Sequence, residues 1–449
     1  MKPTYLTWLD IFRLGLVQTA LGSLVVLSTS VLNRVLVVEL ALAAMVPGIL
    51  VALHYAVQLS RPKWGHSSDV GERRTPWILG GLAVLGIGVL VAAACTMLFA
   101  SYPVAAYVIS ALAFMLIGVG VAASGTSLLA FLAANLEPTR RPAAAASVWL
   151  MMIAGFIITT ATVGSFLDPY SPARLIAIFA VVAVTAFAIA SAALLGIEKK
   201  LARANKTPAR SISRSVATAT RFRAAMAETW QEPKARHFTI FVFVSMLAFS
   251  LQDLILEPFA GIVFEMSPGE STKLSGLQHS GVFAGMLLTG IFGSLLMKRY
   301  SGSMRLFGVV GCLMSAAALA CLALGATVGP GWPLSANIAL LGFANGVFAV
   351  AAIGSMMGLA GEGREAREGT RMGVWGAAQA IGFGLGAFLG TVAVDLAQAL
   401  LDEPANAYAS VFMLESMLFL CAAALASRVS IGSLLQTGRQ QTASVMVGE

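Results

Sequence analysis

Long runs of apolar residues, separated by short polar stretches, recur along the whole chain. A helix of roughly 20 apolar residues is long enough to cross the hydrocarbon core of a membrane. Twelve runs of this kind cover residues 12–32, 40–59, 78–100, 104–133, 143–166, 173–195, 238–257, 276–297, 305–326, 333–360, 371–394 and 408–427. The pattern therefore predicts an all-α membrane protein with twelve transmembrane helices.

The overall composition agrees with this pattern. Hydrophobic residues make up 58% of the 449 positions, charged residues make up 11%, and the mean hydropathy is +0.84. A water-soluble globular protein of this length would not stay in solution with so few charges. The first apolar run is of spanning length and lacks a small-residue cleavage site, so we expect it to be retained as a helix rather than removed as a signal peptide.

Positive charge divides unevenly between the two sides of the predicted bundle. With both termini in the cytoplasm, only Arg34, Arg174 and Lys273 of the 29 Lys and Arg residues fall on the outer side. This bias is what the positive-inside rule requires of a multi-pass protein of a bacterial inner membrane with cytoplasmic termini. It accounts for the net charge of +8 without a nucleic-acid partner. Anionic lipid headgroups are the expected partners of the basic residues.

One long hydrophilic segment divides the chain into two halves. We expect an N-terminal six-helix bundle at 1–195, a cytoplasmic basic linker at 196–237, a C-terminal six-helix bundle at 238–427 and a cytoplasmic tail at 428–449. The linker has two interpretations, which are a helix–loop–helix on the inner membrane surface and a solvated connection.

The two halves also resemble each other. The fourth predicted helix contains LIGVGVAASGTSLLAFLA and the tenth contains LLGFANGVFAVAAIGSMMGLA, and each is followed by a short arginine-bearing loop and a helix rich in small residues. The spacing of Gly342 and Gly346 favours close helix packing. A six-plus-six duplication is typical of parallel membrane repeats, so we expect the 6+6 major facilitator architecture.

The loop after the second predicted helix reads GHSSDVGERRTPW and resembles the major facilitator signature G-x-x-x-D-[RK]-x-G-[RK]-[RK]. The matching residues are Gly65, Asp69, Arg73 and Arg74, and the departures are Val70 and Glu72. An acid at position 69 can pair with basic residues and a helix N-terminus, so we expect this loop to latch the halves together on the inner side.

Polar residues gather where the first and seventh predicted helices approach the outer side. The sequence SLQDLILEPFAG places Asp253 and Glu257 one helical turn apart, and we expect water to reach both. Two adjacent carboxylates favour a nearby cation or a shared proton. We hypothesise that Arg34 pairs with one of them and holds the outer side closed; the alternative is that water and headgroups solvate these charges. The candidate cluster comprises Asn33, Arg34, Glu39, Gln252, Asp253, Glu257 and His279.

Two histidines have chemistry suited to a pigment. Either His54 or His279 could ligate the magnesium of a chlorin or carry a proton, and the alternative for each is a buried, hydrogen-bonded histidine. Glu415, an acid inside the twelfth helix, hints at a protein neighbour. The sequence contains no Walker loop, dinucleotide fingerprint or metal-ligand cluster. We therefore expect no catalytic residues, no metal site and no enzyme activity.

Four stretches carry a specific resemblance. NRVLVVEL at 33–40, VALHYAVQLSRPKWGHSSD at 51–69, RRTPWILGG at 73–81 and QDLILEPFAG at 252–261 resemble the PucC family of phototrophic bacteria, which includes LhaA and a bacteriochlorophyll synthase chain. The motif positions are Asn33, Arg34, Glu39, His54, Gly65, Asp69, Arg73, Arg74, Gln252, Asp253, Glu257 and Pro258. The compact inner loop leans toward the branch found among bacteriochlorophyll synthesis proteins.

The resemblance implies a factor that assembles light-harvesting antenna complexes in the cytoplasmic or intracytoplasmic photosynthetic membrane. It implies bacteriochlorophyll as cargo rather than as a fixed cofactor, and antenna polypeptides or pigment-synthesis proteins as partners. Two alternatives remain, a proton-coupled secondary transporter of a small solute or pigment precursor, and a subunit of a pigment-synthesising enzyme. A transporter would favour charges near the midplane, whereas this chain keeps most charges near the ends of its helices.

Overall fold

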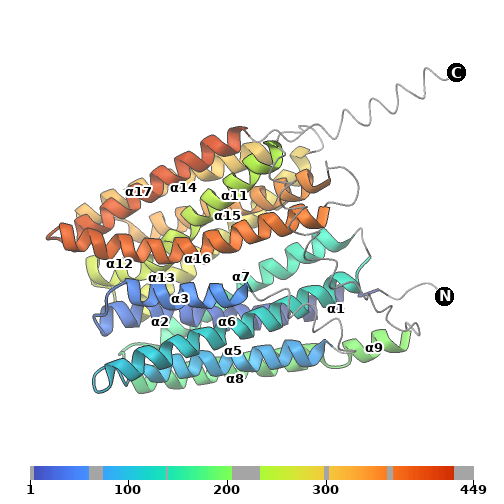
Figure 1. Ribbon diagram of the computed structural model, residues 1–449, viewed down its shortest axis with the longest axis horizontal. Coiled ribbons are helices and arrows are strands. Elements are labelled where there is room, and N and C mark those ends of the chain that lie inside the picture. The colour runs from blue at the N-terminus through green and yellow to red at the C-terminus, as the bar shows by residue number, and fades with distance from the viewer. Residues whose placement is uncertain are drawn as a thin grey trace.

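Helices account for nearly all of the chain that the structure describes. It is a computed structural model and describes residues 5–59, 74–137, 140–204, 233–297, 303–361 and 368–428. Figure 1 shows the helices of the first half of the chain on one side of the molecule and those of the second half, coloured yellow to red, on the other.

The first half contains six long helical segments. The first runs from Trp8 to Glu39 as α1 (Trp8–Val26), η1 (Leu27–Val31), α2 (Leu32–Arg34) and η2 (Val35–Glu39). It is followed by α3 (Met45–Gln58), α5 (Thr75–Cys95), α6 (Pro103–Ala134), α7 (Arg141–Phe166) and α8 (Pro172–Leu194). A short helix, α9 (Ile197–Ala204), comes next.

The second half contains six further segments. The first comprises α11 (Pro233–Leu251), η4 (Gln252–Leu254) and α12 (Leu256–Val263). The others are α13 (Pro268–Met297), α14 (Ser303–Val328) with η5 (Gly329–Gly331), α15 (Leu334–Gly361), α16 (Glu368–Leu400) and α17 (Pro404–Arg428). Among the described residues, ten segments are long and apolar enough to cross a membrane, α3 is a shorter apolar helix, and α13 completes the twelve. The prediction of twelve transmembrane helices is confirmed.

Several helix boundaries differ from the predicted ones, and three of the differences lie beside the polar residues of the first, seventh and eighth segments. The first segment ends at Glu39 rather than at 32, the seventh ends at Val263 rather than at 257, and the eighth begins at Pro268 rather than at 276. Asn33, Arg34 and Glu257 stay inside the helices, and each of them has a hydrogen-bond partner in the other half of the chain.

The two halves have separate apolar cores and meet along two pairs of helices. One core is built mainly from α1 to α8 and the other mainly from α11 to α17. Between the halves, α3 packs against α16 and α7 packs against α13, and Figure 1 shows α16 running alongside α3. Within the second half, α13 and α15 approach closely at Gly342 and Gly346, where an added Cβ would collide with backbone carbonyls of α13.

The start of the predicted linker is anchored to the first half. The chain turns at Gly196, whose φ is +78°, and then forms α9. Lys200 Nζ lies 2.9 Å from Asp10 Oδ2, and Arg13 Nη2 donates to the carbonyl of Leu195 at 2.5 Å. The described part of the linker thus includes a helix held against α1 by charged contacts.

Candidate functional site

Most of the residues singled out in the sequence lie at one end of the bundle. This end holds residues 27–44 and 252–270, and we call it the outer end because the charge bias predicts that it faces the outside. Its hydrogen bonds join the first half of the chain to the second.

Wide helical turns shape the first segment at this end. In η1 and η2 the backbone bonds span five residues, as in the bonds from Leu32 N to Leu27 O and from Leu40 N to Val35 O. Such π-turns insert an extra residue into a helix and often occur at functional sites. They alter which side chains share a face, and Ser30, Asn33 and Arg34 are all buried here.

Three polar side chains of this segment, those of Ser30, Asn33 and Arg34, contact the second half. Ser30 Oγ donates a short hydrogen bond to Glu257, and it lies 3.2 Å from the hydroxyl oxygen of Ser275 on α13. Asn33 Nδ2 donates to the carbonyl of Leu254 at 2.8 Å. The prediction that the first and seventh segments meet at the outer end is confirmed by these contacts.

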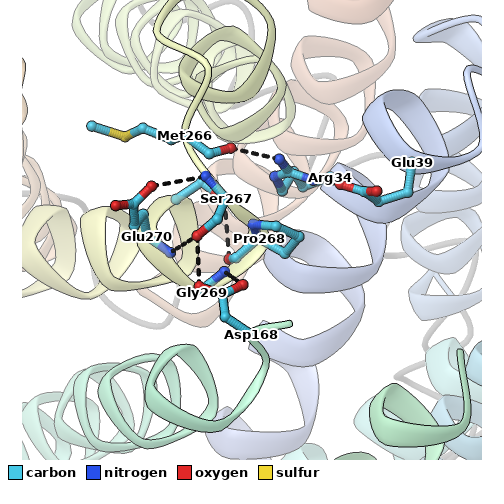
Figure 2. Close-up of polar contacts among 9 residues, drawn as sticks. Arg34, Glu39, Asp168, Met266, Ser267, Pro268, Gly269 and Glu270 are labelled. Carbon is cyan, nitrogen blue, oxygen red and sulfur yellow. Dashed lines mark hydrogen bonds and ion pairs between the residues drawn. The ribbon is translucent and has the colours of Figure 1, made fainter. Parts of the chain in front are cut away.

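Arg34 has partners other than the predicted ones. Its Nη1 lies 2.5 Å from Glu39 Oε1, and its Nη2 donates to the carbonyl of Met266 at 2.7 Å (Figure 2). The direct ion pair of Arg34 is therefore with Glu39 and not with Asp253 or Glu257, although Arg34 lies close enough to Glu257 to interact with it electrostatically. The π-turns explain the difference, since a helix widened to five residues per backbone bond brings positions 34 and 39 onto one face. The arginine still ties the two halves together, but through a backbone carbonyl.

Glu257 is buried, which contradicts the expectation that water reaches it. Its exposed fraction is 5%, because α12 continues beyond it and α13 covers it from the other side. Its Oε1 is bonded to Ser30, whereas Oε2 is buried without a hydrogen-bond partner in the described part of the chain. The acid is therefore accommodated by hydroxyl groups rather than by solvent.

Gln252 and Asp253 belong to different surroundings. They lie in the tight 3₁₀ turn η4, which changes the helix register between Asp253 and Glu257. Asp253 is instead close enough to Glu415 of α17 for their carboxyl groups to interact electrostatically. Gln252 is fully buried, and among the described residues its side-chain amide has no partner.

Glu415 itself is enclosed by its own half of the protein. It is 0% exposed, so the hint that it meets a separate protein is wrong. Within the described ranges, the polar group that favours its charge is the backbone of Gln252. The sequence of the twelfth helix does not indicate that Glu415 lies close to η4.

His279 holds one ring nitrogen fixed and leaves the other free. Nδ1 donates to the carbonyl of Ser275 at 2.8 Å, because a carbonyl can only accept. The ring stands edge-on to Phe156 of α7 at 4.9 Å between centroids. The side chain is half-buried, and in the described structure Nε2 has no hydrogen-bond partner.

His54 lies in the other half of the molecule. It is buried on α3, its Nε2 is 2.7 Å from Gln58 Nε2, and its ring meets Tyr55 edge-on. This geometry fits the alternative of a buried, hydrogen-bonded histidine. The structure does not bring His54 and His279 together.

The predicted inner latch is only partly described. Gly65, Asp69 and Arg73 lie outside the described residues. The backbone N–H groups of Arg74 and Thr75 donate to the carboxylate of Glu198 at 2.6 and 3.3 Å. A carboxylate of α9 thus caps the N-terminus of α5, which favours negative charge. The segment IEKKLARA could have indicated this docking by its strong division into apolar and charged faces.

The outer end also contains residues that the sequence analysis did not single out. Asp168, after α7, accepts hydrogen bonds from Ser267 and Gly269 at the start of α13 (Figure 2). Asp395 of α16 accepts bonds from the backbone at the start of α3. In the loop beside them, burial and the Glu39 carboxylate raise the pKa of the Tyr170 phenol, and Arg34 opposes that rise. No local motif could have found these pairs, since each joins residues far apart in the chain.

The two helical halves and their two contact pairs define a fold of the major facilitator type. Two solved structures share this fold at 14% identity and a TM-score of 0.67. They are the nucleoside transporter NupG, with 94% of this chain and 99% of that one covered, and the peptide transporter POT, with 96% and 98% covered.

The chain belongs to the family described as PUCC protein, which it matches over residues 31–434. It is 50% identical to a Rhodobacter capsulatus protein named Bacteriochlorophyll synthase 44.5 kDa chain, over 99% of this chain and 100% of that protein. It is 29% identical to Protein PucC of Cereibacter sphaeroides, over 90% and 88% of the two chains. The resemblance stated from the sequence is confirmed. Within the described ranges, no group of three His, Cys, Asp or Glu side chains is placed to hold a metal ion.

Proposed function

We propose that the protein is an assembly factor for bacterial light-harvesting antenna complexes and that it helps bacteriochlorophyll reach the antenna polypeptides. The observation that carries this proposal is the family match over residues 31–434. The name of the half-identical relative links that protein to bacteriochlorophyll, and we propose the same pigment as cargo here. In this role the protein would not form the pigment itself and would not be an enzyme.

His279 is the side chain best prepared to bind this cargo. A histidine that ligates a metal commonly donates its other ring N–H to a carbonyl, which fixes the ring and its tautomer. His279 has this arrangement, with Nδ1 on Ser275 and a free Nε2 lone pair. We propose that Nε2 would ligate the chlorin magnesium. His54 is the second candidate, since its Nε2 would first have to leave Gln58.

The remaining features extend the same proposal. The protein would lie in the bacterial inner or photosynthetic membrane with both termini in the cytoplasm. Its bundles would be residues 1–195 and 238–427, joined by a basic linker at 196–237 and followed by a tail at 428–449. The linker would contact anionic lipid headgroups. The protein partners would be antenna polypeptides or pigment-synthesis proteins.

A proton-coupled transporter of a small solute or pigment precursor is the second candidate. It is favoured by the buried acids of the second half, Glu257 and Glu415, because ionisable groups inside a membrane mark proton or substrate paths by default. Against it, the hydrogen bonds described between the halves gather at the outer end, where the direct ion pair of Arg34 is with Glu39 of its own half.

The test is an absorption spectrum of the tagged protein after gentle solubilisation from pigmented membranes. We expect stoichiometric bacteriochlorophyll in the wild type and its loss in His279→Ala. His237→Ala, which removes an exposed histidine at the start of α11, should keep the pigment. A colourless wild-type protein would contradict pigment binding, and pigment retained by His279→Ala would exclude His279 as the ligand.

A further inference from the structure

Two carboxylates close the outer end in matching ways. Asp168 follows the fifth transmembrane segment and faces the start of the eighth, whereas Asp395 lies near the end of the eleventh and faces the start of the second. The fifth and eleventh segments are six apart and therefore occupy equivalent positions in the two halves, as do the second and eighth. The six-helix repeat therefore relates the two contacts to each other.

The first contact caps α13. Asp168 Oδ2 accepts from the hydroxyl of Ser267 at 2.6 Å, and Oδ1 accepts from the N–H of Gly269 at 3.0 Å (Figure 2). Ser267 and Glu270 also form a capping box, with bonds of 2.9 and 3.2 Å between each side chain and the other's backbone. A side chain at Gly269 would collide with Asp168 and with the carbonyl of Gly164, so the close approach requires glycine.

The second contact caps α3. Asp395 Oδ1 accepts from the N–H of Ala44 at 2.8 Å, and Oδ2 accepts from the N–H of Met45 at 2.6 Å. Ala44 has no side chain that could cap its own helix. A carboxylate from the other half therefore supplies the cap, and it also meets the positive end of the helix dipole.

The surroundings of the two contacts match as well. One or two turns further along each capped helix, a glycine faces a threonine of the opposing helix. These pairs are Gly276 with Thr160, and Gly48 with Thr391. In both places the helix backbones approach closely enough that the carboxylate can reach the first amide groups of its neighbour.

We propose that Asp168 and Asp395 are two clasps that hold the halves together at the outer end and release together when that end opens. Each bond crosses from one half to the other. Three join a carboxylate to a backbone N–H group and the fourth joins Asp168 to the Ser267 hydroxyl, and all four donors lose their acceptor when the halves separate. Opening therefore breaks four hydrogen bonds to charged groups, in addition to the bond from Arg34 to Met266. The inference concerns the motion of the protein and does not depend on which cargo it carries.

Hydrogen–deuterium exchange of the purified full chain, read by mass spectrometry, tests the proposal. The first reporter is the pair of backbone amides of Ala44 and Met45, and the second reporter is the backbone amide of Gly269. In Asp395→Asn we expect exchange to rise about tenfold at residues 44–45, as the loss of a hydrogen bond to a charged acceptor implies. The decisive readout is the distant reporter, because linked clasps require exchange to rise at Gly269 as well. Asp168→Asn should give the reciprocal result, and the double variant should exchange fastest at both places.

The control is Asp402→Asn, an exposed aspartate between α16 and α17 for which the structure gives no bond to the other half. It should match the wild type at both reporters. Ser267→Ala, which removes one donor to Asp168 without changing any charge, should raise exchange at both reporters to a smaller extent. Faster exchange confined to the reporter beside each substitution would overturn the proposal, since it would mean that each carboxylate is a local helix cap only.

Discussion

At the scale of single residues, the buried charge of Arg34 is balanced within its own segment. Its exposed fraction is 2%, and Glu39 is five positions along the same chain. A buried charge is costly unless it is paired and hydrogen-bonded, so the carboxylate is required for the arginine to stay inside the protein. The same arginine donates to the carbonyl of Met266, so it also bonds the first half of the chain to the second.

This assignment predicts which acid is coupled to Arg34. Arg34→Gln should lower the free energy of unfolding by about 3 kcal/mol, because it leaves Glu39 unpaired and removes the bond to Met266. In double-mutant cycles of the purified protein, the coupling energy of Arg34 with Glu39 should exceed its coupling with Glu257. Thermal unfolding of the single and double Gln variants measures both. A larger coupling with Glu257 would restore the pairing suggested by the sequence.

At the scale of elements, regular helices could be predicted and irregular turns could not. The twelve apolar runs gave the segments, because membrane spans need length and apolar character and little else. The π-turns of η1 and η2 and the 3₁₀ turn of η4 depend on hydrogen bonds to distant residues such as Leu254 and Met266. They change side-chain register, which is why the sequence could suggest polar residues of interest but not the partners that they contact.

The same register places Glu415 of α17 against η4. Its carboxyl group is fully buried near Asp253, and the backbone of Gln252 is the polar group that favours its charge. Replacing it with a neutral group of equal shape removes the cost of burying an acid beside Asp253, so Glu415→Gln should raise the free energy of unfolding by about 1 kcal/mol. The measurement is thermal unfolding of the purified variant.

The matched control is Glu403→Gln, since Glu403 is exposed beside the same helix. This substitution should change stability little. A clear loss of stability in Glu415→Gln would mean that its negative charge is held by a partner and that the acid contributes to folding.

At the scale of the whole molecule, the sequence was sufficient for the 6+6 architecture but not for how the halves are joined. The repeat could be read from the echo of the fourth and tenth helices. The joining residues could not, because Asp168 and Asp395 contact positions about a hundred or more residues away. A transporter-like fold closed at one end is compatible with passing a cargo to a neighbouring membrane protein, which is the role we propose.

The most direct test of that role is the near-infrared absorption spectrum of membranes from cells that lack this protein, compared with cells in which it is restored. We predict that the antenna bands fall strongly while bacteriochlorophyll is still made and can be extracted from the cells. Loss of bacteriochlorophyll synthesis itself would indicate an enzyme subunit, and antenna bands that remain unchanged would indicate a transporter with another cargo. Either result would contradict the account.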